Sequence, residues 1–76
     1  MKLTIQEVHT YNNLVKEGNV LPLELAGCDT SEFGGLVMPR LDENDEVYFH
    51  DLASGVNVYP GINTIEKIKK AIDNIK

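Results

Sequence analysis

Helical patterns at the two ends of the chain confine any β-structure to the residues between them. Near the N-terminus, apolar residues recur at helical spacing, and Thr4 with Glu7 fits a capping box, in which each residue satisfies a free backbone N–H of the other. Gly18 is placed to take the left-handed conformation that ends a helix. The spacing predicts a helix over residues 4–17.

The C-terminal segment predicts a second helix. Asn63 and Glu66 fit another capping box, and Pro60 with Gly61 fits the central positions of a type II turn just before it. Lysines in the last turns complement the helix dipole. The isoleucines of this segment form one helical stripe, which consists of Ile65, Ile68, Ile72 and Ile75.

Four short apolar segments between the helices predict strands. They comprise residues 20–26, 36–41, 47–52 and 56–59. Pro22 cannot donate to a strand ladder, so we expect the first strand at an edge, and Pro39 predicts an edge or a bulge for the second. Residues 27–35 form a loop by composition. The order α-β-β-β-β-α predicts one α+β domain over residues 1–76, a four-stranded antiparallel sheet with the N- and C-terminal helices packed on one face.

The small size of the chain limits how it can be stabilised. A core built from 76 residues contributes only about 3–5 kcal/mol net, so small domains often rely on disulfides, metals or oligomerisation. Cys28 is the only cysteine, which excludes a disulfide within the chain and is typical of a reducing compartment. The N-terminal residues lack the apolar run of a signal peptide, and no segment is long enough to span a membrane. We therefore expect a cytoplasmic protein.

Negative charge is concentrated in the middle of the chain. Between Glu17 and Glu66 the sequence holds ten acidic residues against Arg40 alone, while the net charge of the whole chain is −5. This balance argues against direct binding of nucleic acid or an anionic membrane. It favours either an ordinary solvated surface or a field that attracts a basic protein partner, for example a nucleic-acid-binding protein.

One face of the predicted sheet keeps apolar and aromatic area. Closing the last two strands with a two- or four-residue loop places Val47, Phe49, Val56 and Val58 on one face, with Tyr48, His50, Asn57 and Tyr59 on the other. An exposed apolar patch indicates an interface with a second copy or with another protein, and we expect a homodimer. The alternative is that Tyr48 and Tyr59 are ordinary solvent-side residues whose rings pair across the strands. The predicted partner-binding residues are Asp42, Glu43, Asp45, Glu46, Tyr48, His50, Tyr59, Met38 and Arg40.

Candidate catalytic and metal-binding residues lack the partners that such chemistry needs. Cys28 has no basic neighbour to lower its thiol pKa, and His50 and Asp51 point to opposite faces of a strand. The acidic run over residues 42–46 lacks the loop of a calcium site and is expected in a turn. No glycine-rich phosphate motif occurs, and a domain of this size seldom encloses a ligand pocket. We expect no catalytic residue, cofactor or metal.

The sequence as a whole favours a small acidic binding or inhibitor protein, of the kind found in phages and mobile elements, rather than an enzyme. Three alternatives remain open. The chain could imitate DNA and block a nucleic-acid-binding protein, it could be a structural or accessory subunit of a larger assembly, or it could use the loop over residues 27–35 with His50 as an enzyme or ligand-binding domain.

Overall fold

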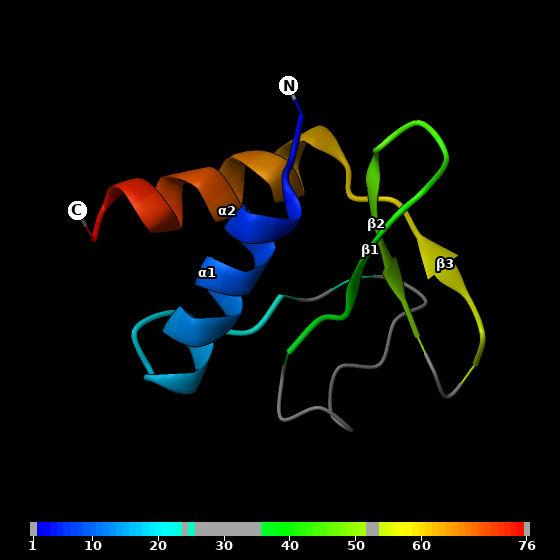
Figure 1. Ribbon diagram of the computed structural model, residues 1–76. Helices are drawn as coiled ribbons and strands as arrows, with labels where there is room; N and C mark the ends of the chain where they lie inside the picture. Colours follow the sequence, from blue (N-terminus) through cyan, green and yellow to red (C-terminus); the bar gives the residue numbers. More distant parts are fainter. Residues whose placement is uncertain (1, 24, 26–35, 52–53, 76) are drawn as a thin grey trace.

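The computed structural model describes residues 2–23, 25, 36–51 and 54–75. These residues form two helices and a three-stranded antiparallel sheet of order β1-β2-β3 (Figure 1). The elements are α1 (Ile5–Lys16), β1 (Pro39–Leu41), β2 (Val47–His50), β3 (Asn57–Val58) and α2 (Ile62–Asp73). The combination of two helices with an antiparallel sheet agrees with the α+β class predicted from the sequence, but the described part of the chain has one strand fewer than predicted.

Helix α1 begins and ends as its sequence predicts. Thr4 is the N-cap and forms the capping box with Glu7. At the other end Gly18 has a φ of 78°, and its N–H donates to the carbonyl of Val15 at 3.0 Å. The N–H of Asn19 donates to the carbonyl of Leu14 at 2.9 Å, which completes a Schellman motif. Both end signals of this helix are confirmed.

Helix α2 begins earlier than predicted. Its first residue is Ile62 and its N-cap is Gly61, which makes no side-chain capping bond, so the predicted capping box at Asn63 and Glu66 is wrong. The predicted type II turn is also wrong, because Gly61 has a φ of −76° rather than a positive value. The extended backbone of Gly61 is a suitable N-cap conformation, and the helix forms from there without a side-chain cap.

The isoleucine stripe of α2 is only partly covered. Ile65 and Ile68 are buried, Ile72 is half-buried and Ile75 is 51% exposed. Figure 1 shows the C-terminal end of α2 extending away from the strands. The stripe is therefore a correct helix prediction, but only the half of it that meets the rest of the protein enters the core.

The register of the sheet follows the predicted alternation. Phe49 pairs with Val58 and His50 pairs with Asn57, so Phe49 lies on the opposite face from His50 and Asn57. Val47 and Phe49 are buried, and Val58 is half-buried. The neighbouring pairing of Pro39 with Phe49 makes β1 the other edge of this sheet, in agreement with the edge position predicted from Pro39.

The predicted first strand is wrong where the structure describes it. Residues 20–23 carry no strand, and Leu25 makes only a single bridge. Leu21 is 80% exposed whereas Leu23 is buried, so the two do not share an apolar face. Pro22 has no N–H to donate, and the hydroxyl of Tyr11 donates to the carbonyl of Leu21 at 2.7 Å, so that this carbonyl bonds to α1. The predicted loop over residues 27–35 lies outside the described residues.

The predicted second, third and fourth strands are shorter than expected. Strand pairing covers Pro39–Leu41, Val47–His50 and Asn57–Val58. Before β1, the backbone of Val37 bonds to a side chain instead of a strand: the amide of Asn12 donates to the carbonyl of Val37 at 2.9 Å and accepts from its N–H at 3.3 Å. Asn12 and Val37 are both buried, so water does not reach the backbone of Val37. The side chain of Asn12 therefore supplies the hydrogen bonds that this N–H and this carbonyl need.

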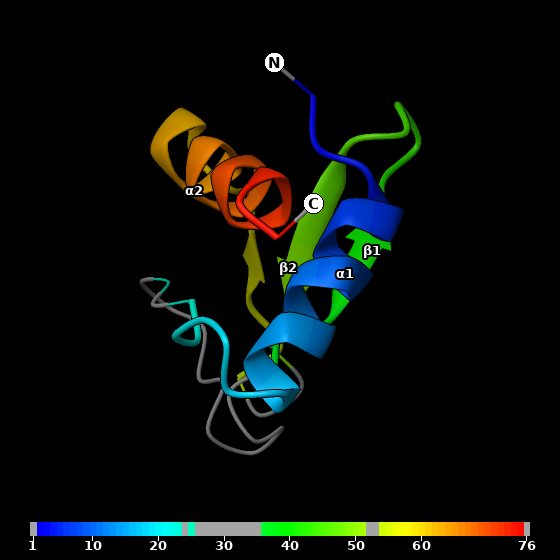
Figure 2. The ribbon, with the colours of Figure 1, turned by 90° about the vertical axis from the view of Figure 1, so that its left-hand side faces the viewer.

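One hydrophobic core joins the helices to the sheet. It contains residues of both helices and of β2, including Val8, Tyr11, Phe49 and Ile68, all almost fully buried. Figures 1 and 2 show α1 beside β1, with α2 crossing α1. Leu3 and Val8 are both buried in this core, in agreement with a hydrophobic staple at the start of α1.

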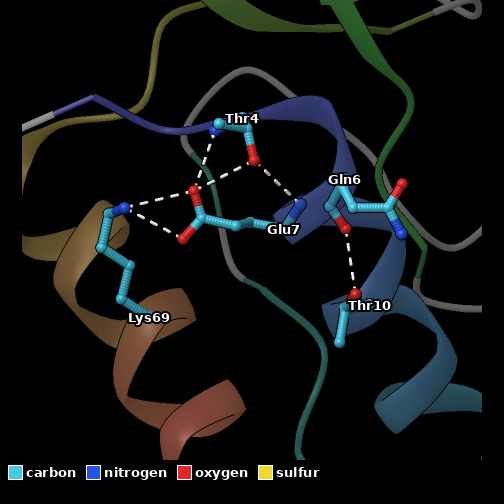
Figure 3. A network of polar contacts seen from close by, with 5 residues as sticks. All are labelled: Thr4, Gln6, Glu7, Thr10 and Lys69. Carbon is cyan, nitrogen blue, oxygen red and sulfur yellow. Dashed lines mark hydrogen bonds and ion pairs between the residues drawn. The ribbon is translucent and has the colours of Figure 1, made fainter.

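An ion pair links the two helices at the capping box (Figure 3). The carboxylate of Glu7 accepts hydrogen bonds from the backbone N–H and hydroxyl of Thr4, both at 3.1 Å. The same carboxylate accepts from the ammonium group of Lys69 on α2, at 2.9 and 3.1 Å. Partial burial raises the pKa of Glu7, but the hydrogen bonds from Lys69 and Thr4 outweigh it, so the pKa lies below its usual value.

None of the helices in the described ranges is both long enough and apolar enough to cross a membrane.

We expect Asn12→Ala to lower the free energy of unfolding by roughly 2–3 kcal/mol, because it leaves the N–H and carbonyl of Val37 without partners in a buried place. Urea denaturation followed by circular dichroism measures the change. Asn13→Ala is the matched control, since Asn13 is the exposed neighbour on the same helix. Equal unfolding free energies for the two variants would contradict the role assigned to Asn12.

We expect Glu7→Gln to cost about 0.5–1 kcal/mol at pH 7, because glutamine keeps the capping box but loses the ion pair with Lys69. The carboxyl has a lowered pKa in the folded protein, so its stabilising effect is complete above the unfolded value of 4.5. That effect is lost as the pH falls through the lower, folded pKa. Unfolding measured at pH 7 and pH 3 should show the difference between wild type and variant shrinking at pH 3; a constant difference would count against it.

Candidate functional site: the acidic turn and the outer sheet face

The turn between β1 and β2 carries four acidic residues and has a fixed backbone. We call residues 42–46 the acidic turn. The N–H of Asp42 donates to the carbonyl of Glu46 at 3.0 Å, and the N–H of Asp45 donates to the carbonyl of Asp42 at 3.1 Å. One carboxylate oxygen of Asp42 also accepts from the N–H groups of Asn44 and Glu46, at 2.8 and 2.9 Å. Asp45 has a φ of 61°, the left-handed conformation that closes such a hairpin.

The carboxylates of the acidic turn have different surroundings. Asp42 makes structural hydrogen bonds inside the turn, whereas Glu43, Asp45 and Glu46 are exposed. Three carboxylates therefore face solvent on a backbone that is already ordered. A partner that binds them does not have to order the turn, which lowers the entropic cost of binding.

A hydrogen bond connects the acidic turn to the end of β3. The hydroxyl of Tyr59 donates to the second carboxylate oxygen of Asp42 at 2.9 Å. The N–H of Glu46, followed by Tyr59 and the N–H of Asn44, lowers the pKa of Asp42 below its usual value. The negative charge of Asp42 in turn raises the pKa of Tyr59, because its hydroxyl donates to that carboxylate.

The rings of Tyr48 and Tyr59 pack against each other on the face of the sheet opposite Phe49. Their centroids are 5.5 Å apart and their planes are tilted by 38°. This is the cross-strand ring pair that the alternative interpretation of the sequence predicted. The pair does not hide the aromatic surface, however, because Tyr59 remains 54% exposed.

We use the name outer face for the side of the sheet that carries these rings. Arg40 pairs with Tyr48, His50 pairs with Asn57, and the N–H of His50 donates to the carbonyl of Met38 at 3.1 Å. The outer face therefore consists of Met38, Arg40, Tyr48, His50, Asn57 and Tyr59. Nδ1 of His50 lies 2.6 Å from the side-chain oxygen of Asn57.

The structure brings all the predicted partner-binding residues together. Those of the outer face and those of the acidic turn meet where Tyr59 bonds to Asp42. Met38 is 38% exposed and Arg40 is exposed, so the surface combines apolar, aromatic and cationic groups with a neighbouring acidic turn. Tyrosine, methionine and arginine are the residues that protein interfaces favour.

A hollow that the sequence did not predict lies beside this surface. It has a volume of about 520 Å³, is open to solvent and lies between the acidic turn and the start of α2. Its lining includes Lys2, Glu46, Tyr59, Pro60 and Ile62. The hollow is open rather than enclosed, so it does not contradict the expectation that a domain of this size seldom encloses a ligand pocket. A second open hollow, of about 870 Å³, lies where α2 passes the end of α1. The sequence does not indicate that Lys2 and Ile62 line a hollow with Glu46, because only the fold brings these residues close together.

The residues considered for catalysis do not form one site in the described structure. His50 bonds to Asn57 on the outer face, while Asp51 is buried and its carboxylate accepts a hydrogen bond from Ser54 at 2.8 Å. Cys28 lies outside the described residues. Within the part of the chain that can be described, no three potential metal ligands gather.

Comparisons of the chain with protein-family models, with curated proteins and with solved structures found no match.

We expect Asp42→Asn to lower the pKa of Tyr59, because it removes the negative charge that accepts the tyrosine hydroxyl. The asparagine oxygen still accepts the turn's N–H groups, so the turn should persist. NMR titration of the Tyr59 ring signals between pH 8 and 12 measures the change. Glu43→Gln serves as the control, since it removes a charge from the same turn. An unchanged Tyr59 titration in Asp42→Asn would refute the hydrogen bond.

Proposed function

We propose that this protein is a non-enzymatic binding or inhibitor protein that engages a basic protein partner through the acidic turn and the outer face. The observation that carries the proposal is the hydrogen bond between Tyr59 and Asp42, because it makes the acidic turn and the aromatic pair one ordered surface. The exposed carboxylates attract the partner, and the exposed ring and Met38 provide apolar contact area.

The proposal includes the arrangement that leaves the outer face free. We infer that both helices cover the inner face of the sheet. Buried residues support this: Val8 of α1 and Ile68 of α2 share a core with Phe49, which points to the face opposite His50. With the helices on one side, the tyrosine pair lies on the side that faces solvent.

The outer face also fits a second copy of the chain, because a protein of this size gains stability from association and Met38 and Tyr59 are uncovered there. Such a homodimer would cover the surface that the basic partner needs, so a second copy and the partner would compete for it. Sedimentation of the purified protein measures the oligomeric state.

We expect the double substitution Glu43→Lys with Glu46→Lys to abolish capture of the partner, because it replaces attraction by repulsion while leaving Asp42 to hold the turn. The measurement is affinity capture from the native host, followed by mass spectrometry. Binding to the captured partner should also weaken steeply between low and high salt.

The matched control is Glu17→Lys with Asp73→Lys, which changes the net charge equally at exposed positions near the C-terminal ends of the two helices. A protein retained by wild type and by this control, but lost by the turn variant, identifies the partner. Equal capture by both double variants, or capture that is insensitive to salt, would refute the proposal. Sedimentation checks that each variant keeps the oligomeric state of wild type.

A further inference from the structure

The hollow beside the acidic turn has walls of two kinds. Tyr59, Pro60 and Ile62 supply aromatic and aliphatic surface, and Ile62 is 62% exposed. Glu46, on the turn whose backbone is fixed by Asp42, also lines the hollow, and its negative charge acts on Tyr59. An aromatic ring next to a carboxylate, in an open recess, fits a cation with a long apolar stem.

We propose that this hollow holds one arginine side chain of the basic partner. The flat guanidinium group stacks on the face of an aromatic ring and forms paired hydrogen bonds with a carboxylate, whereas the lysine ammonium group does neither as well. The ring of Tyr59 and the carboxylate of Glu46 offer these two contacts, while Pro60 and Ile62 cover the methylene stem. The inference rests on the proposed function and names the chemical group by which the partner is anchored.

Lys2 tunes this site. It also lines the hollow, and its charge acts on Asp42, so it offsets part of the negative potential that an arginine would meet. Lys2 is exposed and therefore free to move aside. Replacing it by alanine removes the competing charge and leaves the lining by Glu46, Tyr59, Pro60 and Ile62 in place.

The probe is the peptide acetyl-Gly-Arg-Gly-amide, added to ¹⁵N-labelled protein while amide NMR signals are recorded. The control is the same peptide with citrulline, which has the shape of arginine without its charge. We expect the arginine peptide to shift the signals of Glu46, Tyr59 and Ile62 with a dissociation constant of order tens of millimolar, as suits one cation–π contact and one exposed ion pair. The citrulline peptide should leave these signals in place.

Variants assign the shifts to the hollow. Glu46→Gln and Tyr59→Leu should each weaken peptide binding roughly threefold or more, since each removes one of the two contacts. Glu66→Gln, which removes an exposed charge on α2, should leave the affinity unchanged, and Lys2→Ala should raise it. The folded state of each variant is checked by its amide spectrum.

Three results would overturn the arginine site: absence of shifts with the arginine peptide, equal shifts with the citrulline peptide, or equal affinity in Glu46→Gln and wild type. None of them bears on the proposed function, which is judged by capture of the partner with the charge-reversed turn. Capture lost with the reversed turn, together with an inert arginine peptide, would keep the binding function and reject this anchor.

Discussion

The buried side chain of Asn12 is the contact on which the arrangement of helix and sheet depends. Its amide group bonds to both backbone polar groups of Val37, just before β1 begins. A backbone position with no strand neighbour on that side would otherwise lose its hydrogen bonds to water on burial, and that cost is a large part of the stability that a small core provides. Tyr11, on the same helix, bonds to the carbonyl of Leu21. Adjacent residues of α1 thus hold the segment that leaves the helix and the segment that enters the sheet.

Glu7 shows how one side chain serves local and tertiary structure together. As the third residue of α1 it completes the capping box, and through Lys69 it also joins α1 to α2. Helix α2 has no side-chain cap of its own, so its position depends more on contacts with the rest of the protein. Ile65 and Ile68 are buried in the core and Ile72 packs against it, whereas Ile75 at the end of the isoleucine stripe is 51% exposed.

Side chains with both a local and a long-range role also occur in the surface that we propose for binding. Asp42 orders the turn through its own backbone and through Glu46, and Tyr59 then connects that turn to the sheet. Of the four acidic residues, one is used for structure and three remain available to a partner. This distinction matters for function, because charges held on an ordered backbone attract a partner without the entropic cost of ordering a mobile loop.

The sequence by itself determined the features that depend on near neighbours in the chain. The start and end of α1, the helical period of α2, the edge position of Pro39 and the alternation that places Tyr48 and Tyr59 on one face all follow from local sterics and hydrogen bonding. The tertiary structure decided the conformation of those segments in which long-range contacts compete with local preferences. The sequence of residues 20–23 resembles that of a strand. In the structure, however, the hydroxyl of Tyr11 donates to the carbonyl of Leu21, and Pro22 has no N–H to donate. The hollow between Glu46 and Ile62 forms because the acidic turn and the start of α2 lie close together in the fold. The spacing of these residues along the sequence does not predict that they lie close together.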